Sequence, residues 1–263
     1  MRIVLLAACG LVLTGCAGSA STNTPAAAPK GASVVAAPSP TNGWCADPEL
    51  NDKQVTFASQ GGYLAAYLLG DARAKIALVL APQSGADACS WLGWAKQQAA
   101  AGYRVLAFDF NGEGRSVRGI TGTFTPSGDV AAAAAYTREQ GAVSVVLIGA
   151  SRGGTAVLVA AARLTPPAAG VVSVSGVAEY MHENAVQAVT RLTVPVLYLV
   201  AKDDSPAADD AQAMYDATSG ERRTLSIVPG RGHGRALVTV GADGSAEASA
   251  AIAAFLTANA KPA

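Results

Sequence analysis

Residues 143–155 read VSVVLIGASRGGT, and this stretch decides the fold of the chain. Its first six residues are almost all apolar and rich in β-branched side chains, which predicts a central strand buried on both faces. The motif Gly149-Ala150-Ser151-Arg152-Gly153 follows directly, and an Ala-, Val- and Leu-rich helical segment runs on to Leu164. A strand, a G-x-S-x-G turn and a helix together predict a sharp turn that holds the Ser151 hydroxyl above the sheet.

The two glycines of this turn have a steric explanation. The turn is so tight that Ser151 must adopt a strained backbone, and side chains two residues before and after it would collide. The helix that follows directs its dipole toward a negative charge that develops beside the hydroxyl. Taken alone, the motif also fits a glycine-rich turn with an idle serine. The flanking strand and helix favour a nucleophilic serine.

Strand and helix patterns alternate along the rest of the chain. Apolar runs predict strands at 76–81, 103–108, 170–174 and 194–201, after a hairpin formed by 53–58 and 63–69. A further strand is expected at 223–228, between two helices. Helical patterns cover 89–101, 129–140, 152–164, 209–217 and 246–258. Repeated strand–helix units imply an α/β fold with a mostly parallel sheet and helices on both faces. Ligands of such sheets bind at the carboxyl ends of the strands.

A nucleophilic serine needs a base, and the base needs an orienting acid. The chain has two histidines, His182 in a polar segment and His233 in a glycine-rich loop after the strand at 223–228. Asp203 and Asp204 follow the strand at 194–201, and only one of these adjacent carboxylates can face a histidine. Asp109 also ends a strand, but we expect it to hold the loop 111–116 through backbone hydrogen bonds.

A serine nucleophile also needs two backbone N–H groups that stabilise the oxyanion. One is expected from Arg152, directly after the nucleophile. The other is expected from the loop after 76–81, where Pro82 has no N–H, so Gln83 is the candidate and Ser84 the reserve. We interpret the Arg152 side chain as an ordinary charge on the helix surface.

Several short motifs carry a family resemblance. In chain order they are Ala81-Pro82-Gln83 with Trp91 downstream, DFNGEGRS at 109–116, the turn at 149–153, Ala201-Lys202-Asp203-Asp204, and PGRGHG at 229–234. From about Lys53 onward the chain thereby resembles the α/β-hydrolase superfamily, whose motifs are His-Gly-x, D-x-x-G-x-G-x-S, G-x-S-x-G, G-x-x-D and P-G-x-x-H-x. Ala81-Pro82 replaces His-Gly, and Ala201 replaces the glycine of G-x-x-D.

The resemblance implies an α/β-hydrolase fold with the catalytic order serine, acid, histidine along the chain. That order selects His233, because Glu179 is the only acidic residue between Ser151 and His182. We therefore expect His182 at the surface or at the rim of the site. The G-x-x-D match selects Asp204 as the acid, while Ala201 in place of glycine leaves Asp203 open.

The same resemblance implies a serine hydrolase that forms an acyl-enzyme. About twenty residues separate the strands at 170–174 and 194–201, where larger members of the superfamily insert a lid. We therefore expect a small, lidless, dienelactone-hydrolase- or esterase-like enzyme for small or accessible carboxylic esters, with no cofactor and no metal. A thioesterase, a peptidase, and a non-catalytic envelope-anchored binding protein are the alternatives.

The N-terminus has the pattern of an export signal. After Arg2, residues 3–13 are apolar but too few to span a bilayer comfortably. Leu13-Thr14-Gly15-Cys16 resembles the lipobox of bacterial lipoproteins, which implies cleavage before Cys16 and acylation of its thiol. An ordinary secretory signal cleaved nearby is the alternative. We expect a signal peptide at 1–15 and a lipid-anchored protein on the extracytoplasmic side of a bacterial membrane.

The next segment, 16–43, is rich in Ala, Ser, Thr, Pro and Gly and carries one charge, Lys30, so we expect a flexible tether. Residues 44–263 suit one α/β domain. Lys and Arg together number 19, as do Asp and Glu, and removing residues 1–15 takes away Arg2 alone, which leaves a net charge of −1. This balance gives no reason to expect a nucleic-acid partner.

Two of the four cysteines remain for a disulfide bond. Cys9 lies in the signal and Cys16 at the lipidation site, which leaves Cys45 and Cys89. An oxidising compartment favours a bond between them, and two buried free thiols are the alternative. The bond would tie the N-terminal edge of the domain to the loop that carries Gln83.

Overall fold

The computed structural model describes residues 35–120 and 123–262 of the chain. The predicted signal peptide, the lipidation site Cys16 and most of the predicted tether lie outside the described residues. Within the described part, no helix is both long enough and apolar enough to cross a membrane.

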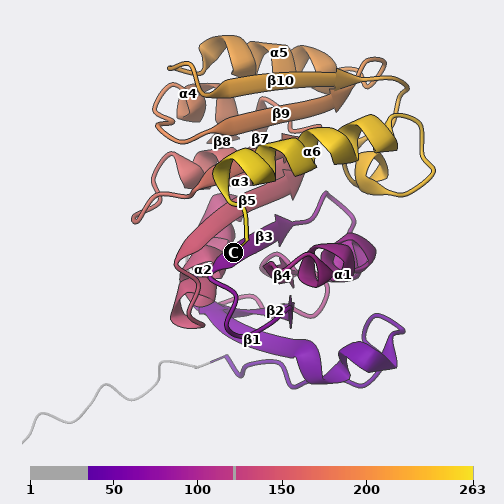
Figure 1. The fold of residues 1–263 in the computed structure, drawn as a ribbon. Helices are drawn as coiled ribbons and strands as arrows, with labels where there is room; N and C mark the ends of the chain where they lie inside the picture. The colour runs from indigo at the N-terminus through magenta and orange to yellow at the C-terminus, as the bar shows by residue number, and fades with distance from the viewer. Residues whose placement is uncertain (1–34, 121–122, 263) are drawn as a thin grey trace, which may run out of the picture. The chain divides into compact units, whose positions relative to one another are not determined.

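An eight-stranded sheet lies at the centre of the described structure, in the order β1-β2-β4-β3-β5-β6-β9-β10 (Figure 1). Its members are β1 Gln54–Ser59, β2 Gly62–Leu69, β3 Ile76–Ala81, β4 Arg104–Phe108, β5 Ser144–Ala150, β6 Gly170–Val174, β9 Val196–Ala201 and β10 Arg223–Val228. Strand β2 runs antiparallel to β1 and β4, and every other pair in the sheet is parallel. The predicted α/β fold with a mostly parallel sheet is therefore confirmed.

Helices cover both faces of this sheet (Figure 1). They are α1 Leu92–Ala100, α2 Pro126–Glu139, α3 Arg152–Ala161, α4 Ala185–Val189, α5 Ala207–Ala217 and α6 Ser245–Asn259, with 3-10 turns η1 Pro48–Lys53, η2 Ala88–Trp91 and η3 Gly234–Val238. Apolar residues of α1 and α6 pack in one core cluster, and those of α2 to α5 pack in another. The sheet separates these two clusters.

Strand β5 contributes to both clusters, as the apolar run predicts. Val145 and Leu147 pack with α2 to α5, whereas Val146 and Ile148 pack with α1 and α6, and all four are buried. Alternate side chains of a strand point to opposite faces, so a strand with helices on both sides must be apolar throughout.

Some element boundaries differ from the prediction. The helix predicted at 89–101 is divided into η2 and α1. Helix α2 begins three residues earlier than predicted, at Pro126, because the Thr125 side chain caps its first turn and proline suits the first helical position. Between β6 and β9 the chain forms a small hairpin, β7 Glu179–Tyr180 with β8 Glu183–Asn184, and then α4.

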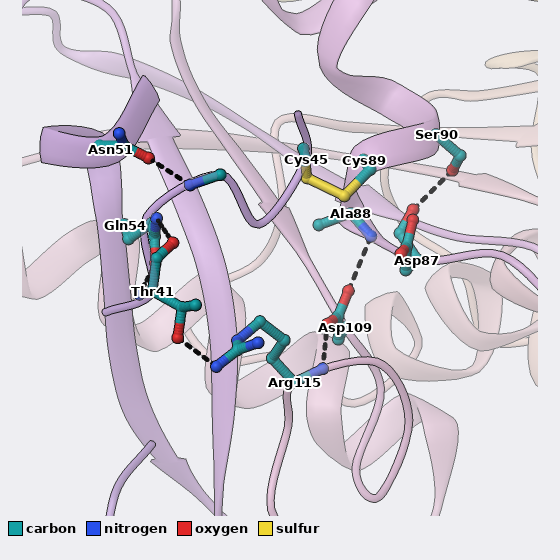
Figure 2. The surroundings of a disulfide bond; sticks show 11 residues. Thr41, Cys45, Asn51, Gln54, Asp87, Ala88, Cys89, Ser90, Asp109 and Arg115 are labelled. Atoms are coloured by element: carbon teal, nitrogen blue, oxygen red, sulfur yellow. Dashed lines mark hydrogen bonds between the residues drawn. A yellow bond between two sulfur atoms is a disulfide. The ribbon is translucent and has the colours of Figure 1, made fainter. Parts of the chain in front are cut away.

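Ordered contacts of the N-terminal segment begin before Trp44. The Thr41 N–H donates to the Gln54 side chain, whose Nε2 donates back to the Thr41 carbonyl, each at 2.8 Å. The Gly43 N–H donates to Asn51 Oδ1 at 3.0 Å. The last residues of the predicted tether therefore lie against η1 and the start of β1 (Figure 2).

The predicted disulfide between Cys45 and Cys89 is present, with the two Cα atoms 5.2 Å apart (Figure 2). Cys45 precedes η1, and Cys89 is the second residue of η2. The bond therefore joins the N-terminal segment to the turn that follows the Gln83 loop.

Candidate active site

Ser151 stands at the turn between β5 and α3 with φ 50° and ψ −119°, which is the strained backbone expected of it. A Cβ atom added to Gly149 would lie 2.1 Å from the carbonyl oxygen of Gly153. One added to Gly153 would lie 2.4 Å from the carbonyl oxygen of Ala81. Neither position has room for a side chain, so the close approach of the neighbouring backbone requires glycine at both positions.

His233 pairs with Asp204, not with Asp203. The Nδ1 atom of His233 lies 2.9 Å from Oδ1 and 3.0 Å from Oδ2 of Asp204. Asp204 is buried directly after β9, whereas Asp203 is exposed. An Nδ1 that donates to a carboxylate leaves the lone pair of the neutral ring on Nε2, where a base needs it. His182 is exposed in the turn between β7 and β8, as expected.

Two further bonds fix the loop that carries His233. The Gly234 N–H donates to Ser175 Oγ, and the Arg235 N–H donates to Gln83 Oε1, both at 2.9 Å. Ser175 is fully buried directly after β6. Ser175 was not predicted as a site residue, and its only signal in the sequence is its place at the carboxyl end of a parallel strand.

The backbone N–H groups of Arg152 and Gln83 are both without an acceptor among the described residues. Arg152 is the first residue of α3, where an N–H has no partner within the helix. The Gln83 loop lies against the Ser151 turn, because a Cβ atom added to Gly153 would lie 2.4 Å from the Ala81 carbonyl oxygen and 2.7 Å from that of Pro82. Both predicted oxyanion donors are therefore available for a ligand.

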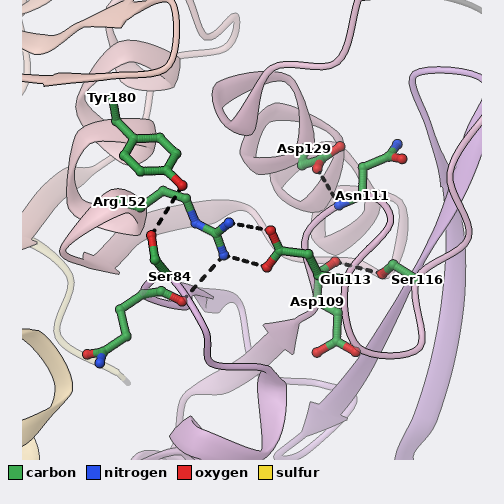
Figure 3. Close-up of polar contacts among 9 residues, drawn as sticks. Ser84, Asp109, Asn111, Glu113, Ser116, Asp129, Arg152 and Tyr180 are labelled. Carbon is green, nitrogen blue, oxygen red and sulfur yellow. Dashed lines mark hydrogen bonds and ion pairs between the residues drawn. The ribbon is translucent and has the colours of Figure 1, made fainter.

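The interpretation of the Arg152 side chain as a surface charge is wrong. Arg152 is only 5% exposed, and its guanidinium forms a two-pronged ion pair with Glu113, one prong at 2.7 Å (Figure 3). Nη2 also donates to the Gln83 carbonyl at 3.3 Å, and the guanidinium lies 4.5 Å above the Phe110 ring. Burial alone would lower the pKa of Arg152, but the Glu113 carboxylate holds that pKa above its usual value.

Asp109 has the structural role predicted for it. The residue is fully buried, and its carboxylate accepts the N–H groups of Ala88 and Arg115, each at 2.7 Å (Figure 2). Its carbonyl accepts the Ser116 hydroxyl at 2.7 Å. Burial raises the pKa of Asp109 to about 6. The first N–H in the loop, that of Asn111, is held by Asp129 instead.

One hollow is lined by Gln83 and another by Arg152, the two predicted oxyanion donors. A groove of about 720 Å³ runs past Gln83 and Arg235, with Trp94 and Cys89 in its wall. A smaller pocket of about 240 Å³ lies beside Arg152, and its lining combines aromatic and apolar side chains with polar and charged ones: Phe110, Phe124, Tyr180 and Met181 with Asn111, Glu113, Arg118 and Asp129. In the described residues, no cluster of His, Cys, Asp and Glu could hold a metal ion.

Comparison with known proteins points to one fold. A family model described as alpha/beta hydrolase fold matches residues 76–195. The esterase RhEst1 from Rhodococcus sp. ECU1013 superposes with a TM-score of 0.64 at 17% identity, covering 79% of this chain and 99% of that one. A thermophilic esterase from Thermogutta terrifontis superposes with a TM-score of 0.64 at 16% identity, covering 78% of this chain and 98% of that one.

A monoacylglycerol lipase from Paleococcus ferrophilus is similar at TM-score 0.63 and 17% identity, covering 75% of this chain and 99% of that one. A search of curated protein sequences found no match. The matched family model, the strand order and the structural likenesses together show that the chain has the α/β-hydrolase fold.

Proposed function

We propose that the chain is a serine hydrolase that cleaves small or accessible carboxylic esters, with Ser151 as nucleophile, His233 as base and Asp204 as orienting acid. The observation that carries the proposal is the bond between His233 Nδ1 and the Asp204 carboxylate, on the same sheet edge as a strained Ser151. A carboxylate on Nδ1 fixes the ring tautomer and stabilises the imidazolium that forms during catalysis.

In the proposed reaction, Ser151 Oγ attacks the ester carbonyl carbon while its proton passes to His233 Nε2. The Arg152 and Gln83 N–H groups, with Ser84 in reserve, stabilise the negative oxygen. The carbon–oxygen bond to the alcohol breaks as Nε2 returns the proton to the alcohol oxygen, which leaves an acyl-enzyme. Water, deprotonated by His233, then attacks the acyl carbon and releases the carboxylic acid and Ser151.

Several features favour an accessible substrate. The His233 side chain is 42% exposed, and Ser151 is half-buried. Only the β7–β8 hairpin and the five-residue α4 lie between β6 and β9. One hollow beside Gln83 and another beside Arg152 give room near the two predicted oxyanion donors. The Rhodococcus and Thermogutta proteins are named as esterases and the Paleococcus protein as a lipase, which agrees with ester chemistry.

The proposal is tested with a panel of p-nitrophenyl esters, thioesters and peptides and with a fluorophosphonate probe. Ser151→Ala or His233→Ala should lower kcat on a short ester by at least about 10³-fold. The probe should label the wild type and not Ser151→Ala. Turnover of thioesters or peptides alone would select one of the alternative hydrolases. Absence of both turnover and labelling in the folded wild type would select a non-catalytic binding protein.

The choice of acid is tested by a matched pair of variants. Asp204→Asn should lower kcat by at least about 10²-fold, because the amide carries no negative charge and its N–H group can donate to Nδ1, which favours the wrong ring tautomer. Asp203→Asn, one residue away and exposed, should leave kcat within about twofold. A larger loss in Asp203→Asn would overturn the assignment of Asp204.

A further inference from the structure

We propose that the buried Arg152 side chain, anchored by Glu113, is a positioning group that holds Gln83 in place and so fixes the spacing of the two oxyanion donors. This inference rests on the proposed hydrolase function, because it assigns the same two N–H groups to the oxyanion. Arg152 would then act twice, with its backbone N–H as one donor and its side chain as the support of the other.

Gln83 accepts hydrogen bonds both at its backbone carbonyl and at its side-chain amide oxygen. Its carbonyl accepts Arg152 Nη2 at 3.3 Å, and its side-chain Oε1 accepts the Arg235 N–H at 2.9 Å. Its own N–H has no acceptor among the described residues. The bonds therefore constrain the orientation of Gln83 while leaving its donor free. They also connect the oxyanion loop to the loop that carries His233.

The bond to the Gln83 carbonyl is long, so its geometry depends on how firmly the guanidinium is held. Glu113 holds the guanidinium from the opposite side with both carboxylate oxygens (Figure 3). The rings of Phe110 and Tyr180 lie 4.5 and 5.8 Å from the guanidinium carbon. A charge buried to this extent needs a hydrogen-bonded partner, and without Glu113 the arginine would move toward water.

A further contact links the oxyanion loop to Tyr180, whose ring lies near the guanidinium. The Ser84 hydroxyl lies 3.3 Å from the Tyr180 hydroxyl, so the residue after Gln83 is tied to the β7–β8 hairpin (Figure 3). Glu113 belongs to the loop that Asp109 fixes through the Arg115 N–H. Arg152 therefore joins three separate segments that follow β3, β4 and β6.

Positioning of this kind affects rate more than substrate binding. Oxyanion donors act because they are already oriented before the charge develops. A displacement of about 1 Å can cost about 100-fold in rate. If Glu113 is lost, the transition state should lose stabilisation while the ground-state ester, which makes weaker bonds to these donors, should be affected little.

The inference is tested with Glu113→Gln and a matched control, Asp71→Asn. The control also breaks a two-pronged arginine–carboxylate pair, Arg73–Asp71, but on an exposed surface away from the Ser151 turn. In Glu113→Gln we expect kcat to fall at least tenfold with KM within about twofold. The Ki of a trifluoromethyl ketone, which mimics the tetrahedral intermediate, should rise in proportion to the loss in kcat/KM. Asp71→Asn should change none of these values.

A second readout does not depend on catalysis. Amide hydrogen exchange of Ala86 and Arg235, whose N–H groups donate to the Gln83 carbonyl at 3.2 Å and to Gln83 Oε1 at 2.9 Å, should be faster in Glu113→Gln than in the wild type or in Asp71→Asn. If Glu113→Gln does not fold, Arg152→Lys gives the same test, because lysine keeps the charge and the backbone N–H but lacks the planar fork. In that variant too, we expect lower kcat and faster exchange.

The outcomes separate the inference from the proposed function. Unchanged kcat, Ki and exchange in a folded Glu113→Gln would overturn the inference and leave the hydrolase proposal intact. Faster exchange in a protein whose wild type neither turns over esters nor reacts with fluorophosphonate would support the arginine contact and overturn the function. A rise in KM that accounts for the whole loss would assign Glu113 to substrate binding and overturn the inference.

Discussion

Backbone geometry at Ser151 accounts for much of the site at the scale of single residues. A positive φ at a non-glycine residue costs on the order of 1–3 kcal/mol, and the surrounding structure must supply that energy. Helix α3 is buried along its whole length, from Arg152 to Ala161, and therefore holds the turn firmly. The glycines at 149 and 153 remove the two collisions that packing could not relieve.

Burial and hydrogen bonding have opposite effects on the pKa of Asp109. Two backbone N–H groups favour its carboxylate, yet burial raises its pKa from 3.8 to about 6. The folded chain therefore binds this proton more tightly than the unfolded chain does. The stability that comes with the protonated form is fully present below about pH 4 and is lost as the pH rises to about 6.

We predict that the free energy of unfolding falls between pH 4 and pH 6.5, with Asp109 contributing up to about 3 kcal/mol. Asp109→Asn cannot ionise and should show a smaller fall, although its lost hydrogen bond lowers stability at every pH. Asp129 and Glu183, whose pKa values burial also raises, should add to the fall in the same direction. Urea unfolding across this range measures the slopes.

The control for this prediction is Asp71→Asn. Hydrogen bonds from Arg73 lower the pKa of Asp71 from 3.8 to about 2, so this exposed group is ionised above about pH 5 in both the folded and the unfolded chain. In Asp71→Asn, the free energy of unfolding should therefore fall with pH about as steeply as in the wild type. Equal slopes in Asp109→Asn and the wild type would contradict the assignment of a raised pKa to Asp109.

At the scale of elements, the parallel strands bring the site together. Ser151 follows β5, Asp204 follows β9, and His233 lies in the loop after β10. The sequence predicts β3, β6 and β10 with their observed bounds. Strands β3 and β6 are largely apolar, β10 (RTLSIV) mixes polar and apolar residues, and each is followed by proline or by Ser-Gly. The pairing of His233 with Asp204 follows from the family motifs, and the structure agrees with it.

Contacts between distant segments are what the sequence could not predict. Arg152 is 39 residues from Glu113 and 69 from Gln83, and nothing in its local pattern distinguishes a buried arginine from an exposed one. Ser175 was missed for the same reason, since its bond to Gly234 spans 59 residues. The η2 turn also escaped prediction, because the Ala88 N–H that begins it is held by Asp109, 21 residues away.

The disulfide gives a prediction about elements. It closes a loop between residues 44 positions apart, for which chain entropy predicts a stabilisation of about 4 kcal/mol. Reduction, or the double variant Cys45→Ser with Cys89→Ser, should therefore lower Tm by roughly 10 °C. Cys89 lines the same groove as Gln83, so ester turnover should fall before global unfolding.

The double variant is also the control for the reductant, because its Tm should not respond to dithiothreitol. Asp109 still holds the start of η2 after reduction, so the loss of turnover should be partial and reversible on reoxidation. An equal Tm for the oxidised and reduced wild type would contradict a stabilising role for the bond.

At the scale of the whole molecule, the N-terminal chain and the candidate site lie at different parts of the sheet. Thr41 and Gly43 contact β1 and η1, and β1 is an edge strand (Figure 1). Strand β5, which leads to Ser151, lies near the middle of the sheet order. An attachment through the N-terminus would therefore reach the domain beside its edge strand β1.

We predict that this attachment is a lipid on Cys16. Two or more acyl chains on one residue hold a protein at a bilayer firmly, whereas a single chain does so only marginally. In a bacterium that expresses the full chain, the wild type should fractionate with membranes, and its intact mass should show a diacylglyceryl group on Cys16. Cys16→Ser should move the protein to the soluble envelope fraction with its ester turnover unchanged.

Cys9→Ser is the matched control, because Cys9 lies in the apolar part of the predicted signal and its loss should alter neither location nor mass of the mature protein. Each outcome identifies one type of signal. A mature N-terminus at another residue, without a lipid, would show an ordinary secretory signal. Membrane association that survives Cys16→Ser would assign the attachment to an uncleaved apolar segment or to a surface of the domain itself, and the lipid prediction would then be wrong.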